Sequence, residues 1–140
     1  MGTTTPNLSI EDRLDITDLF ARYVHTVDSN QADAWVALFT ADGVFDIPGL
    51  MRLEGPEQLR GMVATVAAQG GTWRHQITNI LAEPGATTDE ARVMAYGLVS
   101  DWAEGGKLVT FTDYRVTVRK VEGCWRIAEL VAGSAAPPVA

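Results

Sequence analysis

The chain has 140 residues, a formal net charge of −7, a hydrophobic fraction of 46% and a charged fraction of 21%. This length suits one domain with one core, and the composition is that of an ordinary globular protein, which excludes disordered and fibrous classes. Recognition of a polyanion needs clustered lysine and arginine, and the chain has only 11 such residues in total. Nucleic acid is therefore not an expected partner.

The sequence shows no targeting signal and contains only one cysteine. Residues 1–15 show no basic stretch followed by an apolar run, and no segment approaches the length of a membrane span. The single cysteine, Cys124, excludes an intrachain disulfide framework. We therefore expect a cytoplasmic protein without membrane contact, with one domain over residues 8–131 between flexible tails at 1–7 and 132–140.

The first predicted element is an amphipathic helix from Ile10 to about Val27, with Ser9 as its N-cap. His25 lies on its polar face and is expected in solvent. Tyr23 lies on its apolar face, either as a core tyrosine or as a hydroxyl donor. The apolar face as a whole consists of Ile10, Leu14, Ile16, Leu19, Phe20, Tyr23, Val24 and Val27.

Asp28 comes just past the end of this helix. The helix dipole is unfavourable to an anion there by roughly 0.3–1 kcal/mol. Its carboxylate therefore either begins a simple turn at residues 28–30 or meets a compensating donor from elsewhere in the fold.

A second helix is predicted over Ala32 to Phe39, closed by a turn at 41–43 and followed by a short strand over residues 44–47. Side chains alternate along a strand, so Val44 and Asp46 face one way while Phe45 and Ile47 face the other. Asp46 is therefore a candidate for the interior of the fold.

A short strand at Arg52 to Glu54 precedes a third helix that begins at Gly55-Pro56-Glu57, with proline at its first position, and stops at residues 70–71. The rest of the chain is strand-like and predicts an antiparallel meander. Helices followed by strands favour an α+β fold with the helices on one face of a curved sheet. The four long strand-like runs are 72–81, 91–102, 108–120 and 124–131.

In the first long run, alternation places Trp73, His75, Ile77, Asn79 and Leu81 on one, largely apolar face. A buried imidazole needs hydrogen-bond partners, because an unsatisfied buried polar group costs roughly 1–3 kcal/mol. His75 is thus either a structural histidine bonded to backbone or the partner of Asp28. In the second case the carboxylate would fix one ring nitrogen and raise the basicity of the other.

Motifs for cofactors and metals are absent from the sequence. There is no GxGxxG, P-loop, GxSxG or HExxH string, and the two histidines come from different predicted elements. We therefore expect neither cofactor nor metal, and any chemistry should be cofactor-free proton transfer.

Several strings occur in an order that resembles the SnoaL-like branch of the nuclear-transport-factor-like superfamily, which includes polyketide cyclases, scytalone dehydratase, ketosteroid isomerase and lindane dehydrochlorinase. The resemblance covers roughly Leu8 to Leu130. The strings that carry it are residues 19–23 (LFARY) running into Val27-Asp28, residues 38–45 (LFTADGVF), residues 55–57 (GPE), residues 74–79 (RHQITN) and residues 122–127 (EGCWRI).

The resemblance implies a cone-shaped α+β fold in which three N-terminal helices pack on a curved, mostly antiparallel sheet that encloses an apolar pocket. It matches Asp28 and His75 to the Asp–His dyad of the dehydratase and dehydrochlorinase branch. It matches Tyr23 to the oxyanion-holding tyrosine of the isomerase, and Asp46 stands near that enzyme's aspartate base. Either Asp101 or Asp113 would be its second oxyanion acid.

Three hypotheses follow. The leading one is a cofactor-independent lyase with His75, Asp28 and Tyr23 as catalytic residues and a cyclic ketone, polyketide or steroid-like substrate. The alternatives are an isomerase or aldol-type cyclase that uses Asp46 as base, and a non-catalytic module that binds a small ligand. The predicted substrate-binding residues are Asp46, Trp73, Asn79 and Asp113. A homo-dimer or homo-trimer is expected, because something must cover the second face of the sheet.

Overall fold

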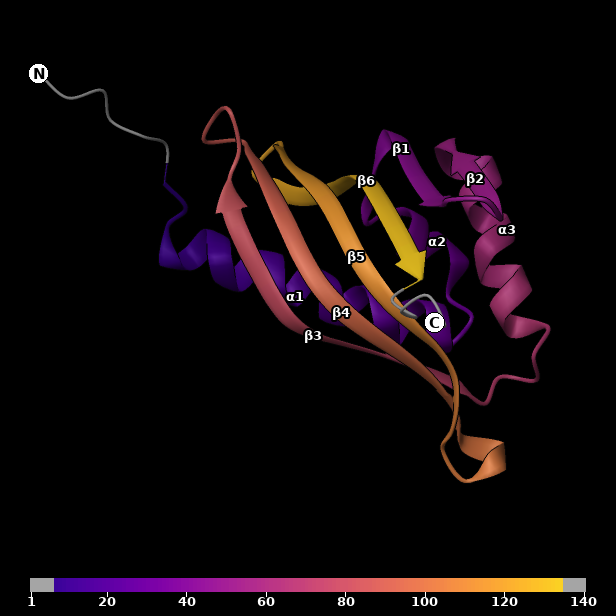
Figure 1. Cartoon of the computed structure of the whole chain (residues 1–140). Helices are drawn as coiled ribbons and strands as arrows, with labels where there is room; N and C mark the ends of the chain where they lie inside the picture. The colour runs from indigo at the N-terminus through magenta and orange to yellow at the C-terminus, as the bar shows by residue number, and fades with distance from the viewer. Residues whose placement is uncertain (1–6, 135–140) are drawn as a thin grey trace, which may run out of the picture.

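A single six-stranded sheet dominates the computed structural model, which describes residues 7–134. Neighbouring strands are antiparallel except β1 and β6, which are parallel. Figure 1 shows the long strands curling together, with α1 running across one face and α3 beside β1 and β2. The sheet order is β2 (Met51–Glu54), β1 (Phe39–Ile47), β6 (Cys124–Ser134), β5 (Lys107–Val121), β4 (Glu90–Asp101), β3 (Trp73–Pro84). The helices are α1 (Ile10–Asp28), α2 (Ala32–Val36), α3 (Gly55–Ala67) and the 3₁₀ turn η1 (Trp102–Glu104).

The helix α1 begins as predicted, because the Ser9 side chain accepts a hydrogen bond from the backbone N–H of Asp12 at 2.9 Å. The predicted apolar face was wrong at its start, since Ile10 and Leu14 are 80% and 65% exposed. The first turns of the helix extend past the core, and Leu8, just before the helix, is buried instead. The buried residues of α1 are Ile16, Leu19, Phe20, Tyr23 and Val27.

The second predicted helix was too long. α2 ends at Val36, and Phe39 already belongs to β1, where it lies opposite Ile127 of β6. The backbone N–H of Ile127 donates to the carbonyl of Leu38 at 2.8 Å, and the Phe39 ring packs on Trp35. This long-range pairing overrides the local turn signal, and residues 40–43 form an irregularity within the strand rather than a turn before it.

The third helix and the meander agree with the sequence. Pro56 lies in the first turn of α3, and Leu59, Val63 and Val66 form its buried stripe. Strands β3 to β6 pair in antiparallel order. The strand β6 continues to Ser134, so residues 132–134 are not the tail that the sequence predicted. Residues 1–6 and 135–140, which were also predicted to be tails, lie outside the described residues.

A bulge in β3 breaks the predicted alternation. The register with β4 shifts between Thr78 and Leu81, and Asn79 has a φ of 55°. Asparagine tolerates this left-handed conformation better than most residues, which suits it to a bulge. Beyond the bulge the faces exchange, so that Ile80 is partly buried against the core while Leu81 is 48% exposed. Asn79 and Leu81 therefore do not share the inner face with His75, contrary to the prediction.

Candidate active site

The end of α1 is built to hold Asp28 in place. The backbone N–H of Gln31 donates to the carbonyl of Thr26 at 2.9 Å, and that of Asn30 donates to the carbonyl of Val27. Asn30 has a φ of 57°, so these bonds close the helix in the Schellman arrangement that a left-handed residue permits. Asp28 is the last helical residue, and the chain turns away immediately after it.

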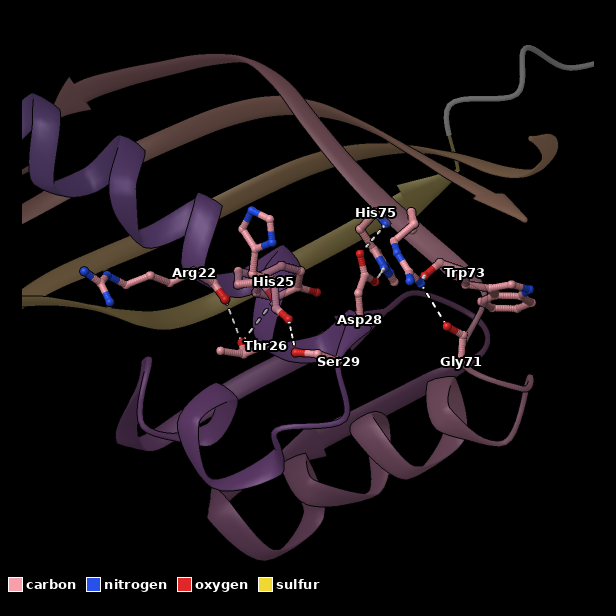
Figure 2. Close-up of polar contacts among 10 residues, drawn as sticks. Arg22, His25, Thr26, Asp28, Ser29, Gly71, Trp73 and His75 are labelled. Atoms are coloured by element: carbon pink, nitrogen blue, oxygen red, sulfur yellow. Dashed lines mark hydrogen bonds and ion pairs between the residues drawn. The ribbon is translucent and has the colours of Figure 1, made fainter. Parts of the chain in front are cut away.

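Asp28 contacts His75 through both of its carboxylate oxygens. Its Oδ1 lies 2.6 Å from His75 Nδ1, and its Oδ2 accepts the backbone N–H of His75 at 2.8 Å. Figure 2 shows the carboxylate directed at the imidazole. The side chains are only 9% and 7% exposed, which strengthens their interaction relative to a surface pair. The second contact also satisfies a backbone donor of β3, which is an edge strand of the sheet.

Two buried tyrosines stand beside this pair. The Tyr23 ring meets the His75 ring edge-on with centroids 6.5 Å apart, and it meets the Tyr114 ring with centroids 6.4 Å apart. Burial, together with Tyr114 and Asp28 nearby, raises the pKa of Tyr23 well above its ordinary value. Burial also raises the pKa of Tyr114 to about 12, with a contribution from Asp28. Both hydroxyls are therefore protonated near neutral pH and are able to donate.

Sequence reasoning missed Tyr114 as a site residue. The strict alternation of Tyr114, Val116 and Val118 in β5 does place its ring on the buried face. What the sequence did not reveal is the register that sets Tyr114 opposite Ala95 and diagonal to Gly97 of β4. That register decides which buried aromatic residue lies beside the dyad.

A cleft of about 1010 Å³ runs between α1 and the edge strand β3. The Asp28–His75 pair lies in it, together with residues of the loop that follows α1. Its apolar lining comes mainly from Phe20, Ala21 and Val24 on α1 and from Ile77 and Ile80 on β3. The structure thus combines a carboxylate–imidazole pair with an apolar wall, an arrangement suited to proton transfer on a small organic molecule.

Two further residues of this cleft escaped the sequence analysis. Arg74 and Trp102 both line it, with the guanidinium carbon of Arg74 5.1 Å from the centroid of the Trp102 ring. The pairing of Trp73 with Asp101 across β3 and β4 brings η1 next to Arg74, which a single sequence does not show. His25 also lines the cleft and is exposed, as its place on the polar face predicted.

The structure does not bring the four predicted substrate-binding residues to this cleft. Asp46 lies 3.4 Å from Arg52 across β1 and β2, and Asp113 lies 3.4 Å from Arg115 on the face of β5 opposite to Tyr114. Trp73 extends away from the dyad in Figure 2, and Asn79 is exposed in the bulge. None of the four is among the described residues that line the cleft.

Asp101, the other candidate acid, has a local structural role. Its Oδ1 accepts from the Thr72 hydroxyl at 2.7 Å and from the backbone N–H of Ala103 at 3.0 Å. It thus caps η1 and ties the start of β3 to the end of β4. Within residues 7–134, no three His, Cys, Asp or Glu side chains gather as a metal site would require. No helix in the described part of the chain is long and apolar enough to cross a membrane.

Comparisons with known proteins show which family the chain belongs to. The SnoaL-like domain model matches residues 8–131, whereas no curated protein matches. A proposed aromatic ring hydroxylase from Novosphingobium aromaticivorans is 30% identical, with a TM-score of 0.77 over 94% of each chain. A proposed scytalone dehydratase from the same species is 18% identical, with a TM-score of 0.76 over 91% of this chain and 86% of the other. Hexachlorocyclohexane dehydrochlorinase LinA-type3 from Novosphingobium barchaimii is 20% identical, with a TM-score of 0.75 over 94% and 92%. Because the family model covers most of its length, the chain belongs to the SnoaL-like domain family.

Proposed function

We propose that the protein is a cofactor-independent lyase in which His75, oriented by Asp28, removes a proton from carbon and a leaving group departs. The observation that carries the proposal is the double contact of Asp28 with His75, at Nδ1 and at the backbone N–H. A carboxylate that only capped a turn would not need to reach a histidine 47 residues away in the sequence.

The contact assigns distinct roles to the two ring nitrogens. With Nδ1–H donating to Asp28, the lone pair of His75 lies on Nε2, and this atom is the base. When Nε2 takes up a proton, the positive charge that forms on the ring lies next to the Asp28 carboxylate. Because both side chains are largely shielded from water, this stabilisation is screened less than that of a surface pair.

In the proposed step the proton leaves a carbon next to an electron-withdrawing group and moves to His75 Nε2. The electron pair of that C–H bond forms the new carbon–carbon double bond. The bond to the leaving group breaks, and its electron pair goes with the leaving group. A departing hydroxide takes the proton from His75 Nε2 and leaves as water, whereas a halide leaves as the anion and His75 returns its proton to solvent. General acid–base assistance of this kind supplies about 10²–10⁴ in rate.

The names of two structural relatives agree with this class of reaction. A scytalone dehydratase removes water, and a hexachlorocyclohexane dehydrochlorinase removes hydrogen chloride. Both are eliminations. The isomerase alternative gains no such support here, because it needs Asp46 in the cleft, and Asp46 instead pairs with Arg52 on β2.

Tyr23 is the proposed donor because its ring meets that of His75, although Tyr23 itself is buried behind the dyad and is not among the described residues that line the cleft. Its raised pKa keeps the phenol protonated, so it donates a hydrogen bond rather than acting as a base. Tyr23→Phe keeps the ring that packs on His75 and removes only the hydroxyl. We expect this change to lower kcat roughly tenfold to hundredfold with little change in KM. If Tyr23→Phe kept the wild-type kcat, Tyr23 would contribute only its packing against His75 and not a hydrogen bond.

The direct test is a panel of elimination substrates that contains scytalone, hexachlorocyclohexane and aryl-fused β-hydroxy ketones. Loss of water is followed by mass and loss of chloride by a chloride electrode. His75→Ala and Asp28→Asn are expected to abolish turnover with the fold intact by circular dichroism. Asp33→Asn, which removes an exposed carboxylate, is the matched control and keeps full activity. Full activity in either dyad variant would end the lyase assignment.

A further inference from the structure

The cleft contains an arginine, Arg74, whose guanidinium is held by backbone carbonyls rather than by an acidic side chain of residues 7–134. Arg74 Nη1 donates to the carbonyls of Gly71 at 2.9 Å and Trp73 at 2.8 Å. Its guanidinium also lies over the Trp102 ring, 5.1 Å from the centroid. These contacts fix the plane of the guanidinium without neutralising its charge. Within the described part of the chain, no carboxylate forms an ion pair with it.

The opposite edge of the same guanidinium is free to bind. Within residues 7–134, Arg74 Nε and Nη2 make no hydrogen bond to protein. Those two N–H groups form the planar fork that fits both oxygens of a carboxylate. Among the described arginines, Arg13, Arg92 and Arg126 also form no ion pair, so what distinguishes Arg74 is that it lines the cleft.

The cleft is less acidic than the molecule as a whole. The chain has a formal net charge of −7, yet Asp28 is the single acidic side chain among the described residues that line the cleft. Its carboxylate is already engaged by His75. Both Asp28 oxygens are directed at His75, so an anion that enters this cleft meets the guanidinium of Arg74, which forms no ion pair with a carboxylate of the described residues. The apolar wall of α1 and β3 favours a hydrophobic body behind the charged head.

We propose that the cleft binds small apolar carboxylic acids. The carboxylate pairs with the Nε and Nη2 edge of Arg74, and the apolar body lies along Phe20, Val24 and Ile80. The inference rests on the proposed function in that it names the substrate class of the same cleft. The binding step itself involves no chemistry, so it is testable with molecules that the protein does not convert.

The experiment compares 2-naphthoate with 2-naphthamide, which have the same ring system and differ in charge. Isothermal titration calorimetry measures both affinities. In the wild-type protein we expect naphthoate to bind about tenfold more tightly, since a charge-assisted hydrogen-bonded pair is stronger than a neutral one. The preference for naphthoate should shrink as salt is added, whereas naphthamide binding should be unaffected.

Substitutions assign the preference to one side chain. Arg74→Gln should bind both probes equally, and Arg74→Lys, which keeps the charge without the planar fork, should retain part of the preference. Arg92→Gln is the matched control, because Arg92 is an exposed arginine of β4 outside the cleft, and it should retain the full preference. Equal binding of the two probes by the wild-type protein, or an undiminished preference in Arg74→Gln, overturns the proposal.

The experiments can refute the lyase function and the carboxylate-binding cleft independently of each other. A His75→Ala variant that loses turnover yet still prefers naphthoate supports both. A naphthoate preference in a protein that converts no elimination substrate supports the acid-binding cleft and counts against the lyase. Turnover of neutral substrates without any preference for naphthoate keeps the lyase and overturns the acid-binding cleft.

Discussion

The ring of Tyr114 lies directly over Gly97 of the neighbouring strand, where a β-carbon at position 97 would overlap Cε2 of the ring. The same ring packs edge-on against Tyr23, which in turn meets the ring of His75. Gly97 is needed for space rather than for an unusual backbone angle, since its φ is not positive. The absence of a side chain at position 97 therefore helps to set the position of the aromatic group beside the dyad.

Gly97→Ala should accordingly destabilise the protein. An added methyl group in a packed core forces neighbouring side chains to shift, at a cost of about 1–3 kcal/mol in the free energy of unfolding. Urea denaturation measures the change. Gly61→Ala is the control, because Gly61 is an exposed residue within α3 with open space around it, and it should gain about 0.5–1 kcal/mol in stability. Equal effects at the two positions would contradict the packing argument.

The buried tyrosines predict how stability changes in alkali. The pKa of Tyr114 is about 12 in the folded protein, above its ordinary value of 10.0, mainly because the group is buried. The unfolded chain therefore releases this proton first as the pH rises. Stability should be intact below pH 10 and fall by about 2–3 kcal/mol between pH 10 and pH 12.

Tyr114→Phe should remove that part of the alkaline loss, as followed by urea denaturation at a series of pH values. Tyr96→Phe takes a hydroxyl from the exposed outer face of the neighbouring strand and should leave the loss in place. If Tyr114→Phe lost stability in alkali as steeply as the wild type, the burial of this hydroxyl would be refuted.

Nuclear magnetic resonance reports on the dyad without any substrate. In the neutral form of His75 the proton should reside on Nδ1, where Asp28 accepts it, and long-range ¹H–¹⁵N correlations distinguish this tautomer from the other. Asp28→Asn should abolish the preference, since an amide oxygen attracts the proton less than a carboxylate does. A wild-type protein with the proton on Nε2 would be inconsistent with the proposed base.

Much of the architecture follows from local sequence signals. The Ser9 cap, the proline at the start of α3 and the two-residue alternation in the long strands were sufficient to place α1, α3 and the meander. The inner position of His75 also followed from alternation, because it lies before the bulge in β3. Its contact with Asp28 was a hypothesis from sequence, drawn from two observations together: a buried imidazole that needs a partner and a carboxylate at the unfavourable end of a helix.

The errors have a common physical origin in long-range pairing. The strand β1 begins at Phe39 because β6 offers it a partner, and β6 lies far along the sequence. The Asn79 bulge exchanges the faces of β3, which no pattern of alternation reveals. Asp46 was placed in the interior by alternation and near the isomerase base by resemblance, and its ion pair with Arg52 depends on the register of β1 with β2. Asp113 was a candidate by resemblance, and it lies two residues from Arg115 on the same face of β5.

The outer face of the sheet predicts self-association. Tyr96, Leu98 and Phe111 are 60%, 37% and 51% exposed on neighbouring strands, and the same face carries both signs of charge in Arg92, Arg115, Glu83 and Glu129. A second copy related by a two-fold axis would pair these charges and cover the apolar residues. We expect a dimer by sedimentation equilibrium and a monomer for Phe111→Asp. An unchanged mass in that variant would exclude this face as the interface.

The most direct measurement uses 5-nitrobenzisoxazole, an apolar reporter of proton abstraction from carbon. A base removes its ring C–H proton, the N–O bond breaks, and coloured 2-cyano-4-nitrophenolate forms. The wild-type protein should accelerate this elimination, and His75→Ala and Asp28→Asn should each lower kcat/KM at least about hundredfold. A His75→Ala protein as fast as the wild type would show that the imidazole held by Asp28 is not the base.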